Sequence, residues 1–246
     1  MAAIGVVAAG INTVAGGGSL ISFPFLTLGA GIPSLESNAT NSASLWPGSL
    51  AGAFGFRDLL HKTKRYFRVL ALPTLSGSVL GAWLLTASSA KTFDTVIPFL
   101  ILLASLLLVV QPKIKELAKK HDRHTPVWVG VVIQFLVSTY GGYFGAGMGI
   151  MMLGSFALYM EGNIHELNAV KNWLGLIINL VASILLALKG LVLWGPFLAL
   201  TAGSLLGGFY AAKWSQRVDS DKLRGIIAAY GFAMTVYFFW RAFAAS

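Results

Sequence analysis

Cysteine is absent from the 246 residues of the chain, and charged residues are scarce. The lack of cysteine excludes disulfides, thiolate metal sites and cysteine nucleophiles. Charged residues make up 11% of the chain and hydrophobic residues 56%, with a mean hydropathy of +0.74. A soluble domain carries about 25% charged residues. The composition therefore predicts an integral membrane protein with no separate soluble domain.

The residues of common enzyme sites are scarce too. The chain has 4 histidines and 9 acidic residues, with no H-E-x-x-H pattern and no facing acid pair, and its glycine runs lack the G-K-[ST] of a phosphate loop. We therefore expect no enzyme activity, no cofactor and no metal. The net charge of +9 is better explained by membrane orientation and contact with anionic lipid than by nucleic acid.

Long charge-free segments dominate the chain, and almost all of them can span about 30 Å of hydrocarbon as helices. The eight segments are 1–35, 37–56, 69–90, 95–112, 125–160, 172–188, 190–212 and 225–240. They predict an all-α polytopic membrane protein. The tryptophans near segment ends are expected to anchor at the headgroups.

The first and fifth segments contain glycine clusters, at Ala15–Ser19 and Gly145–Gly149. Each glycine costs a helix roughly 1 kcal/mol, and unwound backbone inside a membrane is tolerated only where protein or a watery cavity satisfies it. Both segments are therefore predicted to be pairs of half-helices of about ten residues. The second half-helix is expected to begin near Gly18 and Ser19 in one segment, and near Met148 and Gly149 in the other.

The chain also repeats itself. A shift of 131 positions superposes Ala15-Gly16 on Ala146-Gly147, Gly18 on Gly149, Gly31 on Gly162, Asn41 on Asn172 and Leu45 on Leu176; a shift of 126 superposes Gly77-Ser78 and Gly81 on Gly203-Ser204 and Gly207. We interpret this as a duplication, with a first transmembrane repeat at 1–112, a basic cytoplasmic linker at 113–126 and a second transmembrane repeat at 127–246. Broken segments in matching positions point to a transporter's substrate site.

Most lysines and arginines fall into three clusters, which the positive-inside rule places in the cytoplasm. The clusters are Arg57, Lys62, Lys64, Arg65 and Arg68; Lys113, Lys115, Lys119, Lys120 and Arg123; and Lys213, Arg217, Lys222 and Arg224. They share one face only if the fifth segment enters and leaves on the same side. This predicts two inverted repeats, each with a broken, re-entrant helix and three transmembrane helices. The alternative has eight spanning segments in parallel repeats and leaves the third cluster outside.

The residues Gly16–Leu26 (GGGSLISFPFL), followed by Gly31-Ile32-Pro33 and Asn38-Ala39-Thr40-Asn41, resemble the amino-terminal signature of the TauE/SafE sulfite exporter family. The resemblance extends over essentially the whole chain. It implies a transporter that moves sulfite, sulfoacetate, taurine-related sulfonates or other sulfur-containing anions across the plasma membrane. The second repeat departs from the first at Leu153-Gly154-Ser155, where the first has a proline, and at Lys171, which matches Thr40.

The half-helix N-termini are the first candidate for the site, because unpaired N–H groups and the helix dipole favour an oxyanion. The residues expected there are Gly17, Gly18, Ser19, Gly147, Met148 and Gly149. The alternative is that these glycines merely permit close helix packing. For Gly77/Gly81, Gly203/Gly207 and Gly48/Gly52 we favour packing.

Polar residues of the second and sixth segments complete the predicted substrate site: Asn38, Thr40, Asn41, Asn168, Lys171 and Asn172. A lysine within a membrane segment is expensive and faces a cavity or a partner, so Lys171 is expected to neutralise the anion. Snorkelling, or a pair with Glu161 or Glu166, is the alternative. The asparagines and the threonine can donate to the anion, or form hydrogen bonds between helices worth about 0.6 kcal/mol each.

Weaker candidates for the cavity wall are Asn12, Thr13, Trp46, Tyr140 and Trp173. The tryptophans can equally pack in the core, and Asn12, Thr13, Ser138, Thr139 and Tyr140 can cap the first half-helices. For His165 and Glu166 we favour capping over proton coupling.

Together these features predict a secondary permease of the plasma (inner) membrane for small sulfur-containing anions such as sulfite, sulfoacetate or other organosulfonates. Export by alternating access, with the anion near the midplane, is expected. The alternative is a passive anion channel of the same architecture. The expected partners are the anion and membrane lipid, and the sequence leaves the oligomeric state open.

Overall fold

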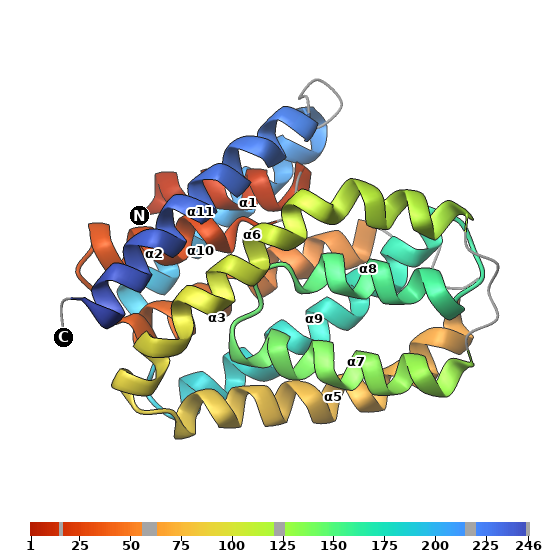
Figure 1. The fold of residues 1–246 in the computed structure, drawn as a ribbon, viewed down its shortest axis with the longest axis horizontal. Helices are drawn as coiled ribbons and strands as arrows, with labels where there is room; N and C mark the ends of the chain where they lie inside the picture. The colour runs from red at the N-terminus through yellow and green to blue at the C-terminus, as the bar shows by residue number, and fades with distance from the viewer. Residues whose placement is uncertain (15–16, 56–62, 121–125, 215–219, 245–246) are drawn as a thin grey trace.

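A computed structural model describes residues 1–246 except 15–16, 56–62, 121–125, 215–219 and 245–246. All of the regular structure in the described part is helical (Figure 1). The first half contains α1 (Ala2–Val14), α2 (Ser19–Pro24), the π-helical turn η1 (Phe25–Gly29), α3 (Ser34–Gly55), α5 (Lys64–Ala87) and α6 (Ala90–Lys120). The second half contains α7 (Val127–Tyr143), α8 (Met148–Tyr159), α9 (Ile164–Leu188), α10 (Trp194–Trp214) and α11 (Ser220–Phe243).

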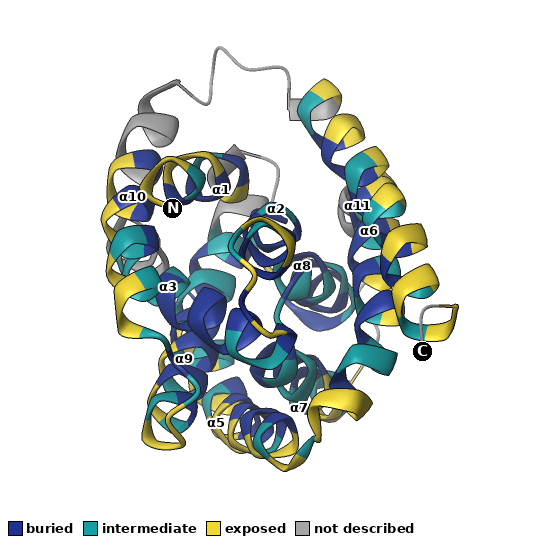
Figure 2. Cartoon of the chain, turned by 90° about the vertical axis from the view of Figure 1, so that its left-hand side faces the viewer, coloured by how far each residue is buried: buried dark blue, intermediate teal, exposed yellow. Residues whose placement is uncertain are grey.

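The all-helical prediction is confirmed, and four helices are both long and apolar enough to cross a membrane. Their qualifying stretches are Lys64–Ala87, Ala90–Ile114, Glu166–Leu188 and Lys222–Phe243, among the described residues. Many exposed side chains are large and apolar, as contact with lipid requires. Examples are Leu72, Trp128, Leu198, Ile226 and Val236. Figure 2 shows these exposed faces on α5, α10 and α11, and buried helices such as α2, α3 and α8 inside.

Both glycine-rich segments are broken into two helices, as predicted. The second helix of each pair starts where expected, with Gly18 as the N-cap of α2 and Gly147 as the N-cap of α8. Gly17 has φ +87° and Gly147 has φ +79°, a left-handed conformation that residues with a β-carbon rarely adopt. The expected length of about ten residues was wrong for α7, which has 17 residues and so measures about 25 Å.

The two helices of each broken pair run in opposite directions. In Figure 1 α7 and α8 lie side by side, and both outer ends lie on the right of the view. The pair formed by α1 with α2 and η1 has its outer ends on the left. The two pairs thus form hairpins that approach the middle of the molecule from opposite ends.

The helix ends that carry basic residues gather at one end of the molecule. The start of α5, the end of α6 and the start of α11 lie toward the right and upper edges of Figure 1, away from both chain termini and the α5–α6 turn. These helix ends include Lys64, Arg65, Arg68, Lys113, Lys222 and Arg224. The first eight residues of the predicted linker, 113–120, continue α6 as a helix.

Each long helix of the first half packs mainly against a helix of the second half. Helix α1 packs along α10, and α7, its counterpart in the second half, packs along α5, the counterpart of α10. Helix α3 contacts α9, and α6 contacts α11. Ser105 and Gly231, which match under the shift of 126, meet each other, because a β-carbon at Gly231 would collide with Oγ of Ser105. The main helix contacts therefore join the first half of the chain to the second.

Two glycine pairs that were predicted to permit close packing lie where α5 contacts α7 and where α10 contacts α1. A β-carbon at Gly77 or Gly81 would collide with the backbone of α7, at the carbonyl oxygens of Phe135 and Thr139. Gly203 and Gly207 face the backbone of α1 in the same way, at Ala2 and Val6. The packing interpretation is confirmed for both pairs. Gly48 and Gly52 lie where side-chain surroundings are outside the described part.

Candidate functional site

The starts of α2 and α8 are closed by tight backbone turns, in which Leu20 and Ile21 donate to the carbonyl oxygens of Gly17 and Gly18, and Met148 and Ile150 donate to those of Gly145 and Gly147. Both N-caps are glycines, Gly18 and Gly147, and neither helix start has a side-chain capping hydrogen bond. The first turn of a helix carries about half a positive charge. Two such helix starts inside the molecule therefore offer polarity suited to an anion.

One turn of α6 lies against both breaks. A β-carbon built at Gly17 would lie 3.0 Å from Cδ1 of Leu108, and one at Gly147 would lie 3.1 Å from Cδ1 of Leu107. The breaks thus meet consecutive residues of the same helix, although they are far apart in the sequence. Gly17, Gly18 and Ser19 are buried, whereas Gly147, Met148 and Gly149 are half-buried.

Hydrogen bonds from two side chains support the second break. Tyr140 Oη donates to the carbonyl oxygen of Ala146 within the break. Asn38 Nδ2 donates to the carbonyl oxygen of Tyr143, the last residue of α7, at 2.9 Å. These bonds satisfy carbonyls that the interrupted helix leaves without partners. Tyr140 therefore bonds to the break itself and not to a terminal carbonyl of α7, which ends at Tyr143.

Lys171 lies two turns into α9, beside the start of α8. A β-carbon at Gly149 would lie 3.5 Å from Cδ of Lys171, so the lysine stem passes directly over this glycine. Lys171 is half-buried, as are Asn168 and Asn172. The spacing of i, i+3 and i+4 places these three residues on one face of α9. The structure thus brings together the predicted cation and the second half-helix N-terminus.

The matching polar residues of α3 are more deeply buried and bond to the protein. Asn38 and Thr40 are 0% exposed and Asn41 is 2% exposed. Thr40 Oγ1 accepts a hydrogen bond from the backbone N–H of Leu193 at 3.0 Å, and Asn41 Oδ1 accepts one from Ser22 Oγ at 2.5 Å. Here the structure favours the alternative of hydrogen bonds between helices. Asn38 Oδ1 is buried and finds no partner in the described residues.

Of the remaining candidate site residues, some pack against neighbouring helices and others lie at the edge of the proposed site. The thioether of Met148 lies between Gly141 of α7 and Gly175 of α9, and its backbone N–H donates to the carbonyl oxygen of Gly145 at 3.3 Å. Trp173 packs edge-on against Phe67, with ring centroids 6.4 Å apart. Trp46 is half-buried, and Asn12 is exposed beside Gly18. The side chain of Thr13 lies outside the described residues.

Glu166 forms a capping box at the start of α9. The backbone N–H of Asn163 donates to Glu166 Oε2 at 3.0 Å, and the N–H of Glu166 donates to Asn163 Oδ1 at 3.1 Å. Such reciprocal bonds satisfy two donors at a helix N-terminus. The capping role favoured for Glu166 is thus confirmed. The side chain of His165 is outside the described part of the chain.

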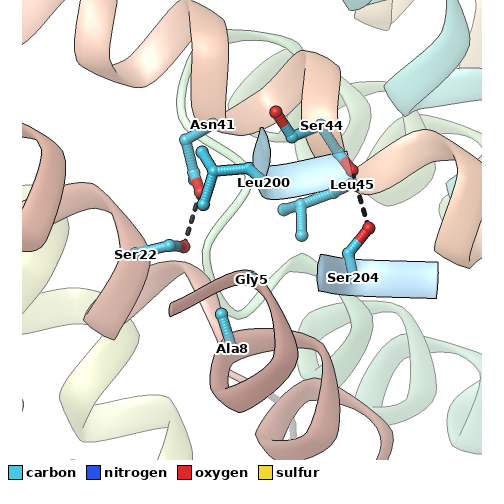
Figure 3. A pocket seen from close by; sticks show the side chains of 8 residues that line it. All are labelled: Gly5, Ala8, Ser22, Asn41, Ser44, Leu45, Leu200 and Ser204. Atoms are coloured by element: carbon cyan, nitrogen blue, oxygen red, sulfur yellow. Dashed lines mark hydrogen bonds between the residues drawn. The ribbon is translucent and has the colours of Figure 1, made fainter. Parts of the chain in front are cut away.

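Three buried serines beside the predicted site residue Asn41 escaped the sequence analysis. Ser22, Asn41, Ser44 and Ser204, together with Gly5, Ala8, Leu45 and Leu200, line a cavity of about 10 Å³ between α1, α2, α3 and α10 (Figure 3). This is the room of about one water molecule. Ser204 was seen only as part of a repeated glycine motif. The sequence around a serine near small residues does not show whether its side chain lines a cavity or packs in the core.

The fold and the site define a polytopic helical membrane protein of the transporter class, with two broken helical hairpins whose glycine breaks meet a common helix. The model of the family described as "Sulfite exporter TauE/SafE" matches residues 1–238, and the chain belongs to this family of membrane transporters.

The chain covers most of the length of several curated relatives. A "Probable membrane transporter protein" of Haemophilus influenzae is 28% identical over 232 residues, covering 94% of this chain and 90% of the relative. The "Probable membrane transporter protein ORF9" of a Sinorhizobium species is 25% identical over 92% of this chain and 86% of the relative. "Probable membrane transporter protein YfcA" of Escherichia coli K12 is 25% identical over 80% and 72%, respectively. No solved structure matches the chain.

Proposed function

We propose that the protein is a secondary permease that exports small sulfur-containing anions, such as sulfite, sulfoacetate or other organosulfonates, across the plasma membrane. The anion binds at the starts of α8 and α2, against the backbone of Gly147–Gly149 and Gly17–Ser19, where the positive ends of the two helix dipoles attract it. Lys171, with Asn168 and Asn172, neutralises and orients it. The observation that carries this proposal is the lysine stem over Gly149, beside a helix start without a side-chain cap.

The proposed transport cycle is alternating access between two inverted repeats. The hairpins approach from opposite ends of the molecule, and the packing partners of the halves are exchanged. Such an arrangement supports a twofold axis in the membrane plane, with the basic helix ends in the cytoplasm. The proposed domain boundaries follow from it, with repeats at 1–112 and 127–246.

A difference between the halves favours a carrier over the passive channel. Helix α6 packs on α8, with Leu107 against Gly147 and Ile114 against Gly154. The matching helices α11 and α2 are in contact through Phe238 and Phe23, whose ring centroids lie 5.9 Å apart. Beside this contact lies an apolar groove of about 320 Å³, lined in part by Tyr230 and Met234. In a carrier with inverted repeats, one half is closed while the other is open. If each half adopted the arrangement of the other, the anion site would be exposed to the opposite side of the membrane.

Counterflow in proteoliposomes tests the transport proposal. Vesicles preloaded with unlabelled sulfite, sulfoacetate, taurine or sulfate are expected to accumulate the labelled form of one sulfur anion transiently above its equilibrium level. A channel would equilibrate the label without this overshoot. Failure of every sulfur anion to exchange would overturn the proposed substrate class and leave the fold untouched. Empty liposomes and vesicles with heat-inactivated protein provide the baseline.

The orientation is tested by labelling single cysteines, for which the cysteine-free chain needs no background mutations. Lys222→Cys at the start of α11 is expected to react with a membrane-impermeant maleimide only after the cytoplasmic face is opened. Ser89→Cys, exposed in the α5–α6 turn, is expected to react from outside in intact cells. External labelling of Lys222→Cys would support eight crossings in parallel repeats instead. Pretreatment with a permeant maleimide shows that both thiols are accessible.

A further inference from the structure

We infer that Arg224, near the start of α11, is a second residue that binds the transported anion, on the cytoplasmic side of the two helix breaks; this inference rests on the proposed function. The side chain of Arg224 is 7% exposed. Among the basic residues whose side chains the structure describes, Arg224 alone is buried. The positive-inside rule accounts for a cation at this end of the molecule, but not for a buried one.

The side chain that holds Arg224 is neutral. Nη1 of Arg224 donates to Oε1 of Gln111 in α6 at 3.3 Å, which is longer than the usual N–H···O distance of about 2.9–3.0 Å. Gln111 is itself 8% exposed. A guanidinium stays charged in proteins, and the amide of Gln111 does not balance this charge. Buried cations in membrane proteins mark ion pathways or pair with an opposite charge.

Gln111 places this guanidinium close to both breaks. In α6 it follows Leu107 by four residues and Leu108 by three, so the three side chains share one face of the helix. Leu107 and Leu108 are the residues that lie against the two breaks. At 1.5 Å per residue, Gln111 is about 5 Å farther along α6, toward the basic end. Arg224 therefore lies about one helical turn from the breaks, on the side of the basic helix ends.

The arrangement of α6 and α11 directs Arg224 into the protein. The two helices lie side by side and run in opposite directions (Figure 1). Gly231, two turns after Arg224 on the same face of α11, meets Ser105 of α6. Arg224 therefore lies on the face of α11 that contacts α6, and not on its lipid face. An anion that arrives from the basic end reaches Arg224 before it reaches the helix starts.

The chemistry of the guanidinium suits the proposed cargo. A guanidinium presents parallel N–H groups that pair with two oxygens of an oxyanion, and these charge-assisted bonds are stronger than a bond to a neutral amide. The arriving anion takes the place of Gln111 as the acceptor. Arg224 thus receives the anion from the cytoplasm, and the helix starts with Lys171 hold it at the midplane.

Counterflow measured separately from the two sides of the membrane tests this role. Inside-out vesicles present the cytoplasmic face to added labelled sulfite, and right-side-out vesicles present the external face. Arg224→Gln is expected to raise the sulfite concentration for half-maximal uptake about tenfold in inside-out vesicles. In right-side-out vesicles it is expected to change by less than about twofold on the same scale. Equal changes from the two sides, or a lower maximal rate alone, would overturn the inference.

Three further variants separate anion binding from other roles of the charge. Arg224→Lys keeps the charge and should recover part of the affinity lost in Arg224→Gln. Gln111→Glu places a carboxylate against the guanidinium and should cause the same one-sided loss, which keeps the test available if Arg224→Gln does not fold. Lys222→Gln removes an exposed cation two residues earlier and should leave uptake unchanged. An equal loss in Lys222→Gln and Arg224→Gln would attribute the effect to surface charge and contradict the assignment.

Thermal unfolding in detergent separates this inference from the proposed function. At constant ionic strength, sulfite is expected to raise the Tm of the unmodified protein relative to chloride, and Arg224→Gln should need about tenfold more sulfite for the same rise. Such a response without counterflow would leave the anion site standing and overturn the proposed transport. Counterflow with unchanged sulfite dependence in Arg224→Gln would do the reverse. A rise in Tm that requires Arg224 but follows addition of phosphatidylglycerol instead of sulfite would assign Arg224 to a lipid headgroup and overturn the inference.

Discussion

Replacing Gly81 by leucine is expected to lower the free energy of unfolding by about 3 kcal/mol or to prevent insertion of a stable protein. A β-carbon at Gly81 would collide with the carbonyl oxygen of Thr139 and approach the backbone N of Tyr143 at 2.9 Å. Both obstacles are backbone atoms of α7, so no side-chain rotation relieves the clash. Helices α5 and α7 would have to move apart along their whole contact, because side chains in close-packed interiors leave few voids.

The duplication predicts an equal loss at the matching position in the other half. Gly207 faces the backbone of Val6 in α1 as Gly81 faces α7, so Gly207→Leu should be as damaging as Gly81→Leu. Gly225→Leu is the control, since a β-carbon there has no atom within 4 Å. The yield of monodisperse protein and its Tm after detergent extraction measure the effect. Normal Tm values for both variants would show that these glycines do not set the distance between the helices.

These glycines illustrate how far the sequence alone could lead. Gly77/Gly81 and Gly203/Gly207 were predicted to be packing positions because small residues spaced four apart let helices approach closely. The breaks were also predictable, because clustered glycines oppose a continuous helix and permit the positive φ seen at Gly17 and Gly147. The local preferences of glycine were sufficient to predict both the packing positions and the breaks. The pairing of α1 with α10 was not predictable, since it depends on contacts between distant parts of the chain.

The polar residues show more clearly what the sequence alone could not predict. Asn41 and Asn172 match under the duplication, but Asn41 is 2% exposed and bonded to Ser22, whereas Asn172 is half-buried. Identical side chains at matching positions thus have different surroundings, because the helices around them are arranged differently. The surroundings of the long helices differ as well: an apolar groove lies beside α11, whereas Leu107 and Ile114 of α6 lie against Gly147 and Gly154. Such differences between the halves depend on tertiary packing, which the sequence repeat does not specify.

The length of α7 was misjudged for a related reason. Half-helices of about ten residues were expected, but α7 continues through Gly141 and Gly142, which are buried against neighbouring helices. A β-carbon at Gly142 would collide with the carbonyl oxygen of Ser78 in α5. These two glycines therefore serve packing, while Gly145 and Gly147, with φ of +82° and +79°, form the break. Composition alone does not distinguish the two uses.

Replacing Lys171 by glutamine is expected to weaken anion binding about 10- to 100-fold, since hydrogen bonds to charged groups contribute about 1.5–3 kcal/mol. The ammonium group supplies full charge beside the start of α8, where the backbone offers only partial charge. The concentration of sulfite that gives half-maximal counterflow measures the affinity, and the maximal rate reports the later steps of the cycle.

Three further variants separate charge from packing. Lys171→Met keeps the aliphatic stem over Gly149 and should lose as much affinity as Lys171→Gln. Lys171→Arg keeps the charge and should retain part of the affinity, although a guanidinium has a different shape. Lys189→Gln removes an exposed cation at the end of α9 and should leave counterflow unchanged. Unaltered affinity in both Lys171→Gln and Lys171→Met would remove Lys171 from the site, and would leave the positive end of the helix dipole at Gly147–Gly149 as the remaining attraction for the anion.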